Sequence, residues 1–462
     1  LRLPDAAPWP LRVLERGSPH FLKHLAPCDP TLLRAGPDFV AASPGVVACY
    51  GPDDMEPRWA RRPAMGRAVR DTKVPDYLRN PLVAPGRFTP AVDDRHVYVR
   101  WAMGESQDQM TQLVALDRRT GVMQWSTADS PALAGVTPVG DPAAADVRVY
   151  CLARRAGLIP HMFVLCLDGE TGALRWSRRL VSQQLMLSFR HRQEKANVDL
   201  IQFGSGVSVH HGAVYVMTNV GVLARLDGRD GLVDWALRYE RVAPQPHQAA
   251  ILPRRGGGPI VIGHTVVVAP RDYPGVIAVD HRTGRRAWTR PIVPSDRLVG
   301  GYDGRVIFAD REYVIALDAR TGETGWRYEA SRPIRSTSLG ASGRIAVAGE
   351  GALVTLDASS GEVVAEAPLD GAAPMAMAAG GGRLAGLAAG PAGFEQAAAQ
   401  ATAAANVPGD RYLAPGGGWR PCSRNSSSRP TWRTNRRPCW CARARSGATC
   451  SRRPTRPCAG DD

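Results

Sequence analysis

Short apolar runs alternate with polar turns along most of this chain, and this pattern predicts many short β-strands. The runs contain few polar positions, as expected for strands that are covered on both faces. Clear examples are Leu113–Leu116, Phe163–Leu167, Val276–Val279 and Val314–Leu317. Each run is followed by Asp and then Gly, residues that are typical of turns. The pattern therefore predicts an all-β protein.

Most of these runs are followed by the same three residue types at fixed positions. An Asp ends the run, a Gly follows four positions later, and a Trp follows four positions after the Gly. The full copies are Asp117/Gly121/Trp125, Asp168/Gly172/Trp176, Asp227/Gly231/Trp235, Asp280/Gly284/Trp288 and Asp318/Gly322/Trp326, and the partial copy Asp357/Gly361 has Ala365 in place of Trp. Such self-similarity identifies a repeat protein.

Each fixed residue has a physical role in a β-hairpin. The Asp carboxylate accepts backbone N–H bonds two residues further on and starts a turn. The Gly supplies the positive φ that a type I turn followed by a bulge requires. The Trp lies on the returning strand, where a ring can bury about 150–250 Å². We expect these Trp rings to pack between repeats, and a ligand-stacking role for one of them is the alternative.

A β-branched strand precedes each hairpin, and a further strand is expected after each Trp, so one repeat forms a four-stranded antiparallel unit. The preceding strands are His96–Val99, Arg148–Cys151, Ala213–Val216, Thr265–Val268, Arg305–Phe308 and Arg344–Val347. The shortest Asp-to-Asp spacings, 38 and 39 residues, are close to the ~40–45 residues of a propeller blade. Trp59 is expected to close a degenerate first unit.

These units predict a β-propeller. Seven blades can be counted, and we expect an eight-bladed design whose last blade is incomplete. In that design the N-terminal strands pair with a strand near residues 380–387. The predicted domains are a Pro-rich N-terminal extension (1–36), the propeller (37–387), an Ala-rich linker (388–413) and a disordered tail (414–462).

The charge is concentrated in the tail. The chain has a formal net charge of +15, but residues 414–462 hold eleven Arg and two Asp, so +9 belongs to the tail and +6 to the rest. A net +6 over a large propeller indicates a solvated surface, and no specific nucleic acid is expected. The tail has no Leu, Ile, Val, Phe or Met. We interpret it as an out-of-frame translation of GC-rich DNA, with a genuine basic nucleic-acid-binding tail as the alternative.

No apolar run approaches the length of a transmembrane helix, so no transmembrane segment is predicted. There is no signal-peptide pattern, but the chain does not begin with Met, and this absence carries little weight.

The motif Ala-x-Asp-x-x-Thr-Gly-x-x-x-Trp resembles the repeat of the pyrroloquinoline-quinone-like (PQQ-like) β-propellers. It is present at Ala115–Trp125, Ala278–Trp288 and Ala316–Trp326, and the resemblance covers about residues 90–370. That family contains quinoprotein dehydrogenases and non-enzymatic members, including the periplasmic scaffold lipoprotein of outer-membrane β-barrel assembly. The resemblance implies the fold strongly and the function weakly. It also implies a bacterial, extracytoplasmic location.

By the same resemblance, a dehydrogenase would have two adjacent cysteines against its quinone and a calcium ion held by carboxylate and amide oxygens. No two cysteines are adjacent here, and no Cys-x-x-Cys-His haem motif is present. Cys439 and Cys441 lack partners at zinc spacing. His210 and His211 are expected at a strand end, pointing to opposite faces. The sequence therefore predicts no catalytic, cofactor-binding or metal-ligating residue.

One predicted loop is a candidate binding element, and a second is not. An insertion at about Val181–Gln202 contains the charged stretch Arg190–Lys195 and is predicted to rise from one propeller face, either to bind a partner or as a solvated loop. The glycines of Arg254–Gly258 do not connect a strand to a helix, which argues against a phosphate-binding loop.

The favoured hypothesis is a monomeric, non-catalytic propeller that binds or scaffolds a protein partner without a cofactor. One alternative is a dehydrogenase that uses PQQ with calcium and has lost the cysteine pair. A further alternative is the sensor domain of a longer regulatory protein.

Overall fold

The structure is a computed structural model. It describes residues 2–4, 31–43, 46–52, 57–61, 89–101, 112–155, 161–182, 206–218, 220–241, 257–270, 272–291, 297–368, 376–380 and 383–390. The chain divides into two units, Leu1–Arg411 and Tyr412–Asp462. All described residues belong to the first unit.

Seven sheets repeat one antiparallel pattern, in which four strands follow one another in chain order. The first contains β2 (Thr31–Ala35), β3 (Asp38–Ser43), β4 (Val46–Tyr50) and β5 (Trp59–Arg61). The second contains β6 (Ala91–Val92), β7 (His96–Trp101), β8 (Gln112–Asp117) and β9 (Met123–Ser126). Two short 3-10 helices, η3 (Thr127–Asp129) and η4 (Pro131–Leu133), follow β9.

The third sheet has a fifth strand, because both β10 (Val136–Pro138) and β11 (Ala143–Ala145) pair with β12 (Arg148–Arg155); β13 (His161–Asp168) and β14 (Leu174–Ser182) complete it. The fourth contains β15 (Gly206–His210), β16 (Ala213–Met217), β17 (Val222–Asp227) and β18 (Val233–Arg238). The fifth contains β19 (Ile260–Ile262), β20 (Thr265–Val268), β21 (Gly275–Asp280) and β22 (Arg286–Pro291).

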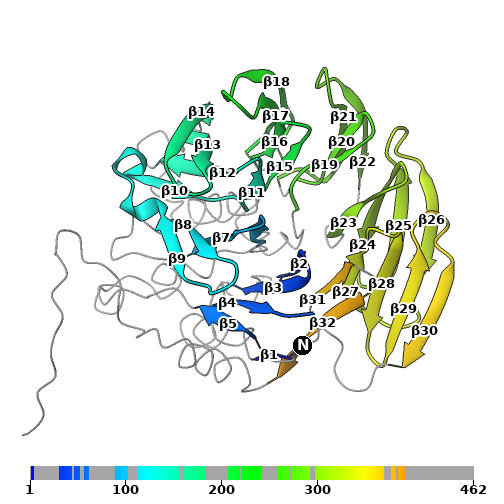
Figure 1. The fold of residues 1–462 in the computed structure, drawn as a ribbon. Helices are drawn as coiled ribbons and strands as arrows, with labels where there is room; N and C mark the ends of the chain where they lie inside the picture. The colour runs from blue at the N-terminus through cyan, green and yellow to red at the C-terminus, as the bar shows by residue number, and fades with distance from the viewer. Residues whose placement is uncertain are drawn as a thin grey trace, which may run out of the picture. The chain divides into compact units, whose positions relative to one another are not determined.

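The sixth sheet contains β23 (Arg297–Tyr302), β24 (Arg305–Ala309), β25 (Tyr313–Asp318) and β26 (Thr324–Glu329). The seventh contains β27 (Ile334–Leu339), β28 (Arg344–Gly349), β29 (Ala352–Asp357) and β30 (Val363–Pro368). An eighth, three-stranded sheet is made of β31 (Ala376–Gly380), β32 (Arg383–Gly390) and β1 (Arg2–Pro4). The sheets follow one another around a ring (Figure 1), so the propeller prediction is confirmed.

The eighth sheet closes the ring with strands from both ends of the propeller. β31 contacts the first strands of its two neighbours, β27 and β2. β1 runs parallel to β32, with Arg2 opposite Ala388 and Pro4 opposite Gly390. An N-terminal strand therefore pairs with the last strand, as expected, but it is β1 at residues 2–4, outside the predicted propeller, and its partners are residues 388–390 of β32.

The prediction that each sheet takes its fourth strand from the segment after the Trp is wrong. β10, which follows Trp125, pairs with β12 in the next sheet, and the fourth strand of each sheet precedes the β-branched strand. The first strands of neighbouring sheets contact each other, so they lie innermost and the Trp strands lie outermost. The chain must therefore return to the centre after each Trp before a new sheet can begin.

The core lies between neighbouring sheets, because a sheet with two apolar faces must be covered on both. Val97, Val99 and Leu116 pack with Val40 and Cys49 of the first sheet. On the other face of the same strands, Tyr98, Leu113 and Ala115 pack with the third sheet. Equivalent clusters join each later pair up to the seventh sheet. Between the seventh and eighth sheets, the cluster is limited to Ala346, Ala348 and Met377, with Leu353 against it.

The strands extend past the predicted limits of the propeller at residues 37 and 387. β1 and β2 lie in the segment predicted as an N-terminal extension, and β32 continues to Gly390. The rest of the predicted linker and the whole predicted tail, residues 391–462, lie outside the described residues. In the part of the chain that the structure describes, no helix has the length and apolar character needed to cross a membrane.

Candidate functional site

The Asp–Gly turns are held together by the Asp carboxylate, as the sequence predicts. In the second sheet, Asp117 Oδ1 accepts the N–H of Arg119 at 3.1 Å, the N–H of Thr120 at 2.8 Å and the Thr120 hydroxyl at 2.8 Å. The N–H of Gly121 donates to the Asp117 carbonyl, and Gly121 has φ = 68°. Asp168 and Asp280 repeat the carboxylate contacts. These carboxylates act in local structure.

Each Trp ring packs on the turn glycine of the following sheet. A Cβ added to Gly172 would lie 2.6 Å from the Trp125 ring, so only glycine leaves room for it. The same close approach joins Trp59 to Gly121, Trp176 to Gly231, Trp235 to Gly284, Trp288 to Gly322 and Trp326 to Gly361. The expected packing between repeats is confirmed, and Trp59 takes part as expected. Trp176 and Trp288 are only half-buried in this packing.

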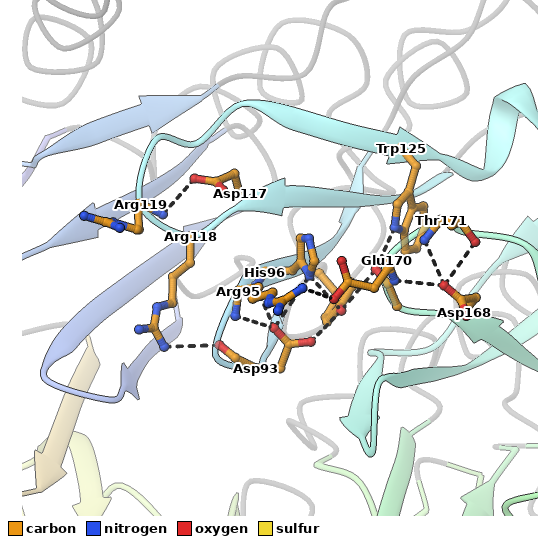
Figure 2. Close-up of polar contacts among 12 residues, drawn as sticks. Asp93, Arg95, His96, Asp117, Arg118, Arg119, Trp125, Asp168, Glu170 and Thr171 are labelled. Carbon is orange, nitrogen blue, oxygen red and sulfur yellow. Dashed lines mark hydrogen bonds and ion pairs between the residues drawn. The ribbon is translucent and has the colours of Figure 1, made fainter.

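The indole N–H of each of these six Trp residues donates to a main-chain carbonyl in the Asp–Gly turn of the following sheet. The acceptor belongs to the residue directly after the turn Asp. Trp125 Nε1 lies 2.8 Å from Gly169 O, and Figure 2 shows the Trp125 ring close to Thr171. The acceptors of the other five are Arg118, Gly228, His281, Ala319 and Ala358. We refer to each Trp–Gly contact with its hydrogen bond as a clamp.

The clamps contain further donors that the sequence analysis missed. Tyr150 Oη donates to Gly228 O at 3.0 Å, and this carbonyl also accepts from Trp176. Arginines two residues after a Trp donate to the turn glycine carbonyl of the next sheet: Arg61 to Gly121, Arg178 to Gly231 and Arg290 to Gly322. The signals were available as the recurrent Val-Tyr of the second strand and the Arg at the second position after Trp.

The turns between the second and third sheets carry the cluster of polar side chains drawn in Figure 2. Asp93 Oδ1 accepts the N–H groups of Arg95 (2.8 Å) and His96 (2.6 Å), and Asp93 Oδ2 accepts the Tyr98 hydroxyl at 2.6 Å. His96 is buried, and its Nδ1 lies 3.3 Å from the Tyr98 hydroxyl. Arg95 bridges to Glu170 of the third sheet at 2.8 Å.

The electrostatics of this cluster favour a structural role. Burial and the neighbouring Asp93 carboxylate raise the pKa of Tyr98, which keeps its hydroxyl protonated as a donor. Burial opposes ionisation of Asp93, but the hydrogen bonds from Tyr98, His96 and Arg95 outweigh it, so the Asp93 pKa is lowered. The Arg95–Glu170 pair is exposed and adds little to stability. The cluster fixes a turn and joins two sheets.

The described cysteines do not fit a disulfide ring against a quinone. Cys49, Cys151 and Cys166 are buried, and none of the three is in a disulfide. Cys151 packs toward the second sheet and Cys166 toward the fourth, so these two thiols lie on opposite faces of the third sheet. Burial raises the pKa of Cys151 to about 12 and that of Cys166 to about 11, and both remain thiols at neutral pH. Within the described ranges, no group of three or more His, Cys, Asp or Glu could hold a metal ion.

The prediction that His210 and His211 point to opposite faces is wrong. β15 ends at His210, and His211 lies in the following turn with φ = 49°. The alternation of side chains ends where the strand ends, and the two rings meet with their centroids 4.1 Å apart. A second histidine pair, His264 and His281, lies at the turns of the fifth sheet. Most of the predicted insertion Val181–Gln202, with its charged stretch Arg190–Lys195, and the start of Arg254–Gly258 lie outside the described residues.

Large apolar side chains are exposed at the outer rim of three sheets. Val122 is 43% exposed, Leu232 58%, Val233 42%, Val363 51% and Val364 50%. All five lie within three residues of a turn glycine, where the outermost strand begins. We call these five residues the apolar rim.

Comparisons with known proteins agree with this architecture. A family model described as outer membrane protein assembly factor BamB matches residues 34–184, 161–300 and 310–406. A quinohemoprotein alcohol dehydrogenase, ADH-IIG, from Pseudomonas putida is 31% identical over 138 residues, which are 30% of this chain and 18% of the dehydrogenase. The chain thus spans less than a fifth of that relative's length.

Two solved structures are similar to this chain at low identity. BamB from Moraxella catarrhalis is 17% identical, with 75% of this chain and 89% of that chain covered and a TM-score of 0.47. Quinohemoprotein alcohol dehydrogenase from Comamonas testosteroni is 14% identical, with 77% and 69% covered and a TM-score of 0.48. With the family model matching most of its length, the chain belongs to the PQQ-like β-propeller repeat family whose model is described as outer membrane protein assembly factor BamB.

Proposed function

We propose that this chain is a non-catalytic, extracytoplasmic propeller that binds a protein partner. The observation that supports this function best is the apolar rim. The adjacent residues Leu232 and Val233, and Val363 and Val364, expose large apolar side chains to solvent, and a partner that covered either pair would remove this apolar surface from water. The rim also lies on outermost strands, whose outer edges are open to a partner's backbone.

The described side chains of the turns and clamps are engaged in holding the sheets together, so the scaffold needs no cofactor in this proposal. The turn carboxylates accept hydrogen bonds from their own turns, and the buried cysteines remain protonated. The match to the BamB family model supports an assembly-factor type of role and a location outside the cytoplasm. We propose a single propeller per functional unit, with a protein and not a nucleic acid as its partner.

Site-specific photo-cross-linking tests this proposal. A photoreactive amino acid replaces Val233 or Val363 in the full chain, and Arg286 of the fifth sheet serves as the matched control because all three residues lie two positions after a turn glycine. We expect one discrete cross-linked protein from the two rim positions and none from the control. Equal labelling at all three positions would contradict a specific surface.

A second candidate is a quinone-dependent dehydrogenase, which the similarity to ADH-IIG over 138 residues favours. The adjacent cysteines expected for this activity are absent from the sequence, so we rank it second. Titration of the purified protein with pyrroloquinoline quinone and calcium, followed by Trp fluorescence, separates the candidates. Saturable quenching that a chelator abolishes would support the dehydrogenase, whereas a flat titration would support the binding module.

A further inference from the structure

Two imidazoles face each other on the turns of the fifth sheet. His264 lies in the turn between β19 and β20, and His281 follows Asp280 in the Asp–Gly turn. The N–H of His281 donates to the His264 carbonyl at 2.9 Å, which fixes the two backbones side by side. The ring centroids are 5.4 Å apart with 27° between the planes, and His264 Nδ1 lies 3.3 Å from His281 Nε2.

Five other sheets provide an internal comparison, because the same main-chain hydrogen bond recurs in the second, third, fourth, sixth and seventh sheets. The donor and acceptor residues are Arg118 and Arg95, Gly169 and Val147, Gly228 and Gly212, Ala319 and Gly304, and Ala358 and Gly343. Among these six turn pairs, only the fifth sheet carries a nitrogen ligand at both positions. The scaffold does not require histidine there, so packing alone does not explain the pair.

The distance between the facing nitrogens suits a shared metal ion. Two imidazole nitrogens at about 2.0–2.1 Å from a tetrahedral ion are separated by about 3.3–3.4 Å. The exposed position of His264 leaves the pair accessible from solvent, and water or a partner's side chain could complete the coordination.

We propose that His264 and His281 form a two-imidazole site for a divalent transition-metal ion of the zinc and copper class. Neutral imidazoles are the usual nitrogen ligands of these ions. Without a metal, the two facing nitrogens form a hydrogen bond with each other. The ion would replace the shared proton and lie beside the line that joins the two nitrogens, with its remaining positions open.

The contact at the other ring nitrogen of His281 is compatible with this role. Tyr215 Oη lies 3.4 Å from His281 Nδ1. With its proton on Nδ1, facing Tyr215, His281 presents the lone pair of Nε2 to the metal.

Calorimetric titration of the untagged full chain with ZnCl₂ tests the site, and electron paramagnetic resonance with Cu²⁺ identifies the ligands. The variants are His264→Ala and His281→Ala, and Ala is the natural residue at the His281 position in the sixth and seventh sheets. His210→Ala is the matched control, because it removes one ring of the other histidine pair.

We expect the parent and the control to bind one more zinc ion than either variant. In the copper spectra, hyperfine coupling to two nitrogens should be present in the parent and lost in both variants. The melting temperature of each metal-free variant should lie within a few degrees of that of the parent, which excludes a folding defect. The same zinc stoichiometry in all four proteins, or a loss in His210→Ala equal to that in the variants, would overturn the proposal.

Discussion

The joints between the first seven sheets differ from the seam at the eighth. Six successive joints each have a Trp ring on a turn glycine and an indole hydrogen bond. At the seam, β30 carries Ala365 in place of the Trp, and all six residues of β30 are exposed. The buried cluster there is formed by Ala346, Ala348 and Met377 on inner strands.

This difference shows that a clamp requires both of its partners. The sequence lacks the Trp after Gly361, and the segment that forms β31 and β32 has no Asp–Gly turn to receive one. The first repeat likewise has Met55 in place of the turn glycine, four residues before Trp59. The series of clamps therefore begins at Trp59 and ends at Gly361, and strand contacts hold the seam instead.

Removing one clamp ring should have the largest effect. Trp125→Ala should lower the free energy of unfolding by about 3–5 kcal/mol, because it leaves a cavity and an unpaired carbonyl between two sheets. Trp176→Ala should cost less, since Trp176 is half-buried whereas Trp125 is only 8% exposed. Urea unfolding of the two variants measures the difference. Equal losses would show that exposure does not set the strength of a clamp.

Changing the glycine tests the other half of the clamp. In Gly172→Ala, the positive φ costs about 1–2 kcal/mol and the clash with the Trp125 ring about 1–3 kcal/mol more. Gly212 is the matched control, because it has φ = 75° and no atom within 4 Å of an added Cβ. Gly212→Ala should therefore lose only the stability that the positive φ costs, without the loss from a clash with a ring. If the two variants melt together, ring contact is not what requires glycine at position 172.

Acid should weaken the turns within the clamps. The Thr321 N–H is the main group that lowers the Asp318 pKa below its ordinary 3.8. A carboxyl whose pKa is lower in the folded state stabilises the protein above pH 3.8, and this stabilisation is lost as the pH falls through the folded-state pKa. Asp318→Asn should therefore be less stable than the parent at pH 7 and approach it below pH 3.8. Melting temperatures across this range measure the effect, and Glu323→Gln in the same turn is the control.

Adding a ring at the seam should have the smallest effect. Ala365→Trp restores the missing residue without its glycine turn, so we expect the free energy of unfolding to change by no more than about 0.5 kcal/mol. Thermal unfolding compares the variant with the parent. A rise comparable to the loss in Trp125→Ala would show that the eighth sheet can accept the ring after all.

The sequence was sufficient to predict the fold because the motif contains local and long-range information together. Asp117 and Gly121 specify a turn by themselves, and Trp125 predicts a neighbour with space for a ring. The strand grouping was wrong because sequence spacing does not show where the chain crosses from one sheet to the next. The histidine geometry was missed because His264 and His281 are seventeen positions apart and are brought together by pairing of turns.

The position after each turn Asp combines a constant main-chain role with a variable side chain. Its residue contributes its N–H to its own sheet and, in six turns, its carbonyl to a clamp. Arg, Gly, His and Ala all occupy this position in one chain. A Cβ at Gly169 or Gly228 would lie 2.6 Å from an atom of a neighbouring turn or strand, and Ala319 and Ala358 are buried. New surface chemistry at this position is therefore limited to turns whose neighbours leave room for a larger side chain, as at Arg118 and His281.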